Sequence, residues 1–367
     1  MIKLFTGAHT KLIKYAKNIS LHLALFFVLN TNLSIAQIDS TDEEEIDFSL
    51  YANAELAGGV KRYCTSKVYD ISPNKLISIG FDYQGKHTLQ NYGLDTSMNT
   101  IAGMGGLRLG FNVPVISKTN VLWSVGGSYW RMNYNFKQPF DSNYFSSALY
   151  ERGLTTLGLN TTIFKPFNEK YFLLAFISAD ANGDFKLGDE KLADYLFAPK
   201  ITLAALYGKK RKDRSMLAFG LTRTYRAGNQ TVFPLILYNH TFENRKWGIE
   251  CLFPSRFNLR RNFNPRNLLF VGYEMEGNSY SIINRTGDSR LNNFELRRSE
   301  IRPRVTFEKS LYGFVWLSVQ TGYRINFRYD IDNGDIFRWL GDPTPYKQTN
   351  QLTNPLYFNI SLNLVSP

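Results

Sequence analysis

Charged and apolar side chains alternate along residues 294–308, which makes this segment the most informative one for chemistry. Arg298, Glu300 and Arg302 fall on one face of an extended chain, and the other face is apolar, as at Ile301. Successive side chains of a strand point to opposite faces. Charged side chains that face one another across a narrow space are what many pores use to select ions. The pattern therefore predicts a charge-lined interior.

Neighbouring segments carry further charge on their polar faces. Such side chains need an interior, because an Arg or Lys that faces lipid near the midplane costs about 2–4 kcal/mol. We expect this interior to be lined by Arg256, Arg260, Arg298, Arg302, Arg304, Arg324, Arg328, Glu250, Glu274, Glu276 and Glu300. Two interpretations stay open: a pore constriction that prefers anions, or a salt-bridge network that fills a closed barrel.

The elements that would position these residues are strands. Apolar and polar residues alternate over about ten residues at a time, as in 107–113, 315–328 and 357–364, which is typical of a transmembrane β-barrel. A soluble sandwich also alternates, but these segments exceed its typical strand of about 5–6 residues. Aromatic residues gather near the segment ends, as interfacial girdles do. The mean hydropathy of −0.26 excludes a bundle of membrane-spanning helices.

The number of strands follows from the number of such segments. Candidate segments begin near residues 48, 75, 100, 121, 154, 171, 200, 215, 231, 247, 256, 268, 294, 313 and 354. A single-chain barrel has an even number of strands, so one candidate is wrong. Region 48–84 and the pair divided by Pro254 and Ser255 are the ambiguous ones. We predict an antiparallel barrel of fourteen strands, with twelve as the alternative.

Connections between these segments alternate in length. Long ones cover roughly 86–99, 135–152, 181–198, 281–293 and 330–353. Short ones include Lys118 to Asn120, Pro166 to Glu169, Lys209 to Arg214, Glu243 to Arg245, Asn264 to Arg266 and Lys309 to Leu311. Bacterial barrels have short periplasmic turns and longer extracellular loops. We therefore expect the long connections to face outside the cell.

The first residues are predicted to form a targeting signal. Residues 1–36 hold four Lys and no acid, then a short apolar run, and end in the small residues Ser34 and Ala36. This order is that of a cleavable signal peptide, with cleavage after Ala36. An acidic periplasmic tail, 37–47, is expected to follow. The predicted barrel then comprises 48–367, and the predicted location is the outer membrane.

Several segments resemble a family of uncharacterised outer-membrane barrels from Bacteroidota, a domain of unknown function. The resemblance lies in Phe233 to Tyr238, Phe242, Trp247 to Pro254, Leu268 to Tyr280 and Gly322 to Arg324. It implies an outer-membrane location and a barrel fold over most of the chain, and it supplies no catalytic residues. The chain departs from the common barrel pattern at its end, where Leu364 to Pro367 lack a terminal aromatic residue.

Other chemistry has little support in the sequence. Two acidic loops suggest weak Ca²⁺ ligands, namely Asp180, Asn182, Asp184, Asp330, Asp332 and Asp335. A turn built on Asn-Gly is the preferred explanation of both loops, so no metal site is expected. No cofactor is expected, because Gly103 to Gly106 precede a strand rather than a helix. Catalysis is not expected either, since His87 and His240 lie near no clustered nucleophile. Whether Cys64 and Cys251 pair stays open.

The charge balance narrows the partners. The formal net charge is +12, and it falls to +8 when residues 1–36 and their four Lys are removed. We attribute part of the remainder to the interior, so no nucleic acid is expected. The expected partners are outer-membrane lipid, the barrel-assembly machinery and small solutes. The predicted function is a porin-like passage for small solutes through an Arg-lined lumen. A closed barrel that acts through its loops comes second, and an outer-membrane hydrolase third.

Overall fold

The computed structural model describes residues 62–92, 96–141, 143–225, 228, 230–283, 294–333 and 346–366. The chain divides into two units, Met1–Val60 and Lys61–Pro367. The described residues all belong to the second unit, so the predicted signal peptide and acidic tail lie outside them. Among the described residues, no helix has the length and hydropathy needed to cross a bilayer.

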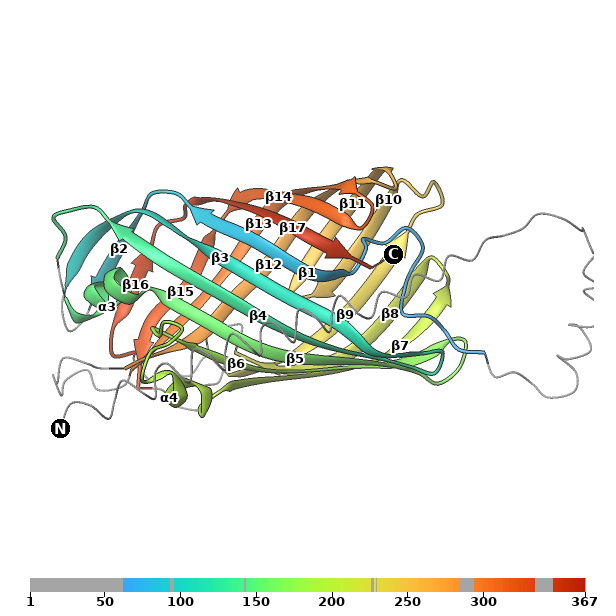
Figure 1. The fold of residues 1–367 in the computed structure, drawn as a ribbon, viewed down its shortest axis with the longest axis horizontal. Coiled ribbons are helices and arrows are strands. Elements are labelled where there is room, and N and C mark those ends of the chain that lie inside the picture. Colours follow the sequence, from blue (N-terminus) through green and yellow to red (C-terminus); the bar gives the residue numbers. More distant parts are fainter. Residues whose placement is uncertain are drawn as a thin grey trace, which may run out of the picture. The chain divides into compact units, whose positions relative to one another are not determined.

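Strands form one closed antiparallel sheet (Figure 1). The first nine are β1 Lys75–Gln84, β2 His87–Tyr92, β3 Ser97–Lys118, β4 Val121–Phe136, β5 Leu154–Pro166, β6 Tyr171–Gly183, β7 Lys200–Lys212, β8 Ser215–Thr224 and β9 Thr231–Thr241. The others are β10 Trp247–Phe253, β11 Arg256–Asn264, β12 Asn267–Ile282, β13 Phe294–Tyr312, β14 Val315–Tyr323, β15 Ile325–Asp332, β16 Thr349–Leu352 and β17 Leu356–Val365. The described residues also include two helices, α3 Tyr144–Arg152 and α4 Leu192–Leu196.

The wall has fourteen strands in the described residues, because three of them are interrupted. β1 with β2, β14 with β15 and β16 with β17 each form one strand of the wall. β1 pairs with both β3 and β17, which closes the barrel. The prediction of fourteen strands is confirmed. The candidate near residue 48 begins outside the described residues, and 62–74 are not in a strand. Pro254 and Ser255 form the turn between β10 and β11.

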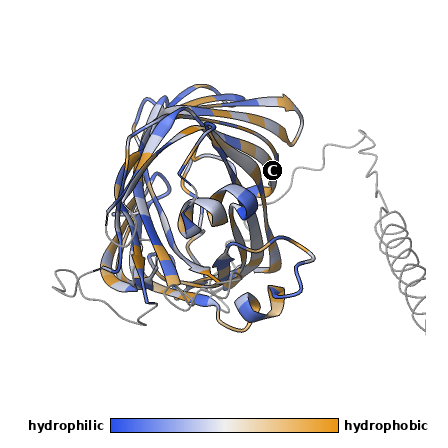
Figure 2. Cartoon of the chain, turned by 90° about the vertical axis from the view of Figure 1, so that its left-hand side faces the viewer, coloured by the Kyte–Doolittle hydropathy of each residue, from blue (hydrophilic) through white to orange (hydrophobic). Residues whose placement is uncertain are grey.

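The wall is apolar outside and polar inside. Along β17, Ile360 is 42% exposed and Leu362 51%, whereas the alternating Ser361 and Asn363 are 7% and 2% exposed. Figure 2 shows the same alternation of hydrophobic and hydrophilic bands around the ring. This reversal of a soluble protein's pattern is that of a barrel whose outer surface faces lipid.

The two ends of the barrel differ. One end carries the turns after β3, β5, β7, β9, β11 and β13, and we call it the turn end. The wall also begins and finishes there, at Lys75 and Val365. The other end, which we call the loop end, carries the long connections. The β8–β9 and β10–β11 connections at the loop end are short, which the sequence did not predict. The strands that they join, β8 to β11, are shorter than β3, β4 and β12.

β12 crosses above these shorter strands. Its residue Ser281 pairs in parallel with Gly183 at the end of β6. A Cβ on Gly183 would lie 2.3 Å from the ring of Tyr195 and 2.6 Å from the Ser281 carbonyl oxygen, so only glycine fits. The barrel is therefore narrower at the loop end than at the turn end.

The two helices lie on opposite sides of the wall (Figure 2). α3, in the β4–β5 connection, lies inside the ring. The side chain of Asn143 caps its start by accepting a hydrogen bond from the Ser146 N–H, and Gly153 ends it with a φ of 68°. α4 lies outside, where its Tyr195 packs with Ala181 of β6.

Candidate functional site

The lumen is filled at the loop end by an apolar plug. Phe145 and Leu149 of α3 are 2% and 0% exposed. They pack with Leu89, Ile101, Met104, Trp130, Met132, Tyr134, Phe136, Leu154, Tyr280, Ile282, Phe294, Leu296, Tyr329, Ile331 and Leu352, which with α3 make up the plug. These residues belong to β2–β5 on one side of the lumen and to β12, β13, β15 and β16 on the other. The helix α3 and the wall side chains around it therefore close the lumen together.

On the turn-end side of the plug lies a layer of charged side chains, Arg298, Glu300, Arg302 and Arg324, which we call the ion layer. Glu300 is 0% exposed and accepts hydrogen bonds from Arg298 Nη2 at 2.8 Å and from Arg302 Nε at 2.6 Å. Arg324 Nε lies 3.4 Å from the same carboxylate. A carboxylate among three guanidinium groups leaves positive charge that other acids must balance.

Those acids come from other strands. Arg302 Nη1 lies 3.2 Å from Asp82 Oδ2 on β1 and 2.9 Å from Glu276 Oε2 on β12. Glu276 also accepts a hydrogen bond from Arg108 Nη2 of β3 at 2.5 Å. The ion layer thus connects strands across the lumen and holds the barrel at a fixed width.

An indole ring lies at the centre of this charge. The guanidinium carbon atoms of Arg108, Arg298 and Arg302 lie 4.2, 5.1 and 5.5 Å from the centroid of Trp130. A guanidinium over an indole gains about 0.5–2 kcal/mol, the more so where water is excluded. Trp130 therefore lets three cations approach one another with the carboxylates between them.

Polar cavities occupy the remaining lumen. A cavity of about 320 Å³ next to the ion layer is lined by residues that include Arg108, Asp180, Glu274 and Glu276. A second of about 290 Å³ lies between β10 and β14, with Arg256 and Arg304 in its lining. A third of about 640 Å³ lies at the turn end beside residues 65–74. The turn-end half of the lumen thus has room for water and small polar molecules.

Residues 62–74, the mouth segment, lie across the turn end of the lumen. Val68 and Cys64 pack with wall residues such as Phe172 and Leu235. The buried Lys210 donates hydrogen bonds to Thr65 Oγ1 at 2.5 Å and to the Lys67 carbonyl at 2.8 Å. The mouth segment narrows this opening, and the cavity beside it remains.

Arg245 holds the mouth segment at one point. Its guanidinium donates two hydrogen bonds to Asp70, at 2.6 and 2.9 Å. This contact lowers the pKa of Asp70 below its usual range. The Asp70 carboxylate therefore stays charged in all but strongly acidic solution.

The structure places most of the predicted interior residues together. Arg260 pairs with Glu250 at 2.7 Å, Arg304 pairs with Glu274, and Arg256 lines a cavity. Arg328 differs from the prediction. Its cross-strand partner is Ser299, which lies on the face opposite Arg298 and Glu300, and its guanidinium lies 5.7 Å from the Tyr346 ring. A register shift here, with Phe327 left over, turns the side chain away from the lumen.

The acidic loops have other partners. Asp184 accepts a hydrogen bond from the Tyr195 hydroxyl at 2.5 Å, and Asp332 accepts one from Arg297 at 2.9 Å. Asp180 lines a cavity and Asp335 lies outside the described residues. The described part of the chain contains no group of three potential metal ligands. The calcium interpretation therefore gains nothing from the geometry.

The cysteines lie on opposite sides of the wall. Cys64 is buried inside with the mouth segment, and both thiols are free. Cys251 alternates with the inward-facing Glu250 and so faces outward. His240 also faces outward, with its ring 6.0 Å from Tyr238 and 5.0 Å from Phe242.

Sequence reasoning did not assign four further residues to the lumen, although it had named Asp180 as a weak Ca²⁺ ligand. Asp82, Arg108, Trp130 and Asp180 line the lumen beside the predicted charges. Each occupies the polar face of an alternating segment, so the same face argument that found Glu274 would have found them.

Comparisons with known proteins place the barrel in context. The sequence model described as "Domain of unknown function (DUF6268)" matches residues 76–364. No curated protein matches. Among solved structures, a COG4313 outer membrane channel from Pseudomonas putida F1 has 14% identity over 81% of this chain and 98% of its own, with a TM-score of 0.35. The toluene transporter TodX from P. putida has 10% identity over 81% and 92%, with a TM-score of 0.30. Likeness at this level does not transfer a substrate.

Proposed function

The chain belongs to the family described as domain of unknown function DUF6268, and on that premise we propose that it is an outer-membrane barrel with a gated passage for small polar solutes. The passage would run from the turn end through the polar cavities to the plug. Opening would require α3 to move.

The outer surface supports the membrane location. Outward-facing residues of β17 run from Leu356 to Leu364, a length of about 27 Å at roughly 3.4 Å per residue. A tilt of about 40° reduces this to about 21 Å along the barrel axis, close to the roughly 25 Å apolar band of outer-membrane barrels. The predicted signal peptide and the need for assembly machinery belong to the same proposal.

One observation carries the proposal of a gated passage. Within the described residues, the β4–β5 connection folds a helix into the lumen at the loop end, where it packs with wall side chains, and polar cavities of about 290–640 Å³ lie on the turn-end side of this plug. Loops and helices that plug a wide barrel are a known way of restricting its channel. Movement of α3 would remove the part of the plug that the strands do not supply.

A permanently closed barrel is the second candidate. It is favoured by Glu300, which is fully buried among three arginines. Such a network is costly to disturb, because an uncompensated buried charge costs about 3–5 kcal/mol. In this interpretation the ion layer braces the wall and the long connections act on partners. Catalysis is not proposed, since His240 faces outward and His87 is buried inside.

Locking α3 to the wall separates the two candidates. Asn99 of β3 donates a hydrogen bond to Ser146 Oγ of α3 at 3.1 Å. We would introduce Asn99→Cys and Ser146→Cys with Cys64→Ala and Cys251→Ala, and join the new thiols with a short bifunctional reagent. The matched control carries Ser146→Cys without Asn99→Cys, in the same Cys64→Ala and Cys251→Ala background, and is treated identically.

Currents across planar bilayers give the readout. A gated passage predicts brief openings before cross-linking, their loss in the locked protein and no change in the control. Currents that persist after locking would show that α3 is not the gate. Absence of current in every variant, including one with α3 loosened by Phe145→Ala, would favour the closed barrel.

A further inference from the structure

Basic side chains gather on the outer wall close to the turn end. Lys165, Lys209, Arg211, Arg261 and Lys309 occupy outward-facing positions at the ends of β5, β7, β11 and β13, and we call them the basic rim. In the described strands, no carboxylate occupies an outward position at this level. The rim is thus positive and without acids of its own.

Strand alternation fixes the direction of these side chains. Lys209 stands between the buried Gly208 and Lys210, and Lys309 follows the buried Glu308. Both are exposed, whereas the side chains of Lys210 and Glu308 point into the lumen. The basic rim therefore continues the lipid-facing rows of the wall instead of projecting from the turns.

Aromatic rings lie directly beside the rim. The Arg261 guanidinium is 4.8 Å from the centroid of Trp247 and 5.5 Å from that of Phe263, and Lys209 Nζ is 5.4 Å from that of Tyr171. Aromatic residues in this position mark the headgroup level of a membrane. A guanidinium stacked on a ring keeps its in-plane N–H groups available for a phosphate.

We propose that the basic rim binds the phosphate groups of anionic phospholipids in the leaflet at the turn end. The argument rests on the membrane location proposed above, and it is independent of whether the lumen conducts. Lipid is favoured over a soluble polyanion because the charges stand on the wall among apolar neighbours. The turn charges Arg214 and Arg245, by contrast, are paired with Glu243 and Asp70.

Lipid retention tests this proposal. The full chain would be titrated in detergent with phosphatidylglycerol or phosphatidylcholine, and bound lipid counted by native mass spectrometry. The rim variant carries Lys165→Gln, Lys209→Gln, Arg261→Gln and Lys309→Gln. The matched control removes four exposed charges near the loop end through Lys86→Gln, Lys137→Gln, Lys186→Gln and Lys191→Gln.

We expect a preference for phosphatidylglycerol that the rim variant loses and the control keeps. Removing one interfacial basic charge weakens anionic-lipid binding about fivefold, so the loss should exceed tenfold. Equal binding of both lipids, or equal loss in both variants, would overturn the proposal. So would heparin binding that depends on the rim without any phosphatidylglycerol preference. A barrel that fails to insert into any vesicle would instead contradict the membrane location.

Discussion

The hydroxyl groups of Tyr134 on β4 and Tyr329 on β15 lie 3.0 Å apart, although their strands are not neighbours in the wall. Figure 1 shows β15 at the same end of the barrel as α3. Contact between two non-adjacent strands means that the lumen is narrow here. Phe145 of α3 packs 6.0 Å from the Tyr329 ring, so helix and wall close the passage together.

Loosening α3 should open the loop end. Phe145→Ala with Leu149→Ala removes two fully buried side chains, each worth about 2–5 kcal/mol in a packed core. We expect faster proteolysis within 137–153 and more frequent channel openings. Glu151→Ala, on the exposed side of the same helix, is the control and should change neither. Unchanged openings in a demonstrably loosened variant would argue against α3 as the closure.

The ion layer should dominate the stability of the wall. Glu300→Gln removes the charge that faces three arginines and is expected to cost about 3–5 kcal/mol in the free energy of unfolding. Glu274→Gln breaks a pair whose carboxylate is 27% exposed and should cost less. Urea unfolding in vesicles, followed by tryptophan fluorescence, compares the two. Equal stability of both variants would show that the ion layer does not brace the barrel.

Acid should release the mouth segment at Asp70. Because Arg245 lowers the pKa of Asp70, its contribution to holding the segment is complete above the unfolded value of about 3.9 and is lost as pH falls through the lower folded value. A spin label on Ser66→Cys, with Cys64→Ala and Cys251→Ala, reports the mobility of the segment. Asp70→Asn should be mobile already at pH 7. Identical mobility of both proteins at every pH would exclude this contact as a restraint.

The cysteines should never form a disulfide in the folded protein. Cys64 lies inside the mouth and Cys251 faces outward, with the wall between them. Oxidation is therefore expected to leave gel mobility unchanged. A lipid-soluble maleimide should label Cys251, and a charged reagent should not. Labelling of Cys251 by the charged reagent in vesicles would place that part of β10 in water.

Strand periodicity predicted the wall because each strand has one apolar and one polar face. The resulting alternation of apolar and polar residues is visible within about ten residues of sequence. It also predicted which charges point inward, as at Arg298 and Glu274. It failed at Arg328, where one extra residue in β15 reverses the face. The position of α3 inside the ring was not predictable either, because it depends on contacts with residues such as Phe294.

If Arg298 and Arg302 lined an open constriction that prefers anions, reversing their charge would alter ion preference. Their contacts in the folded barrel lead to a different expectation. Arg298 and Arg302 are both 1% exposed and are paired with acids from three strands. Arg298→Glu with Arg302→Glu would place several buried carboxylates together, so we expect loss of the folded barrel in place of a change in anion preference.

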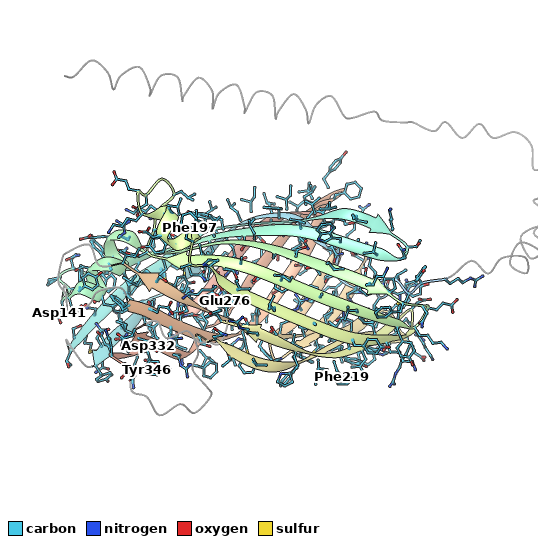
Figure 3. The ribbon with its side chains drawn as sticks, turned by 90° about the horizontal axis from the view of Figure 1, so that it is seen from below. Asp141, Phe197, Phe219, Glu276, Asp332 and Tyr346 are labelled. Carbon is cyan, nitrogen blue, oxygen red and sulfur yellow. The ribbon has the colours of Figure 1, made fainter. Side chains whose placement is uncertain are left out.

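Glu276 marks the depth that a molecule entering from the turn end should reach (Figure 3). Ser128 lines the same cavity and provides a site for a probe. The test uses Ser128→Cys in a chain that also carries Cys64→Ala and Cys251→Ala, inserted into vesicles in one orientation. A small charged thiol reagent is added from one side at a time. The account predicts fast modification from the turn end and slow modification from the loop end, with the second rate raised by Phe145→Ala and Leu149→Ala. Equal rates from both sides, or faster modification from the loop end, would contradict a lumen that is open at the turn end and closed at the loop end.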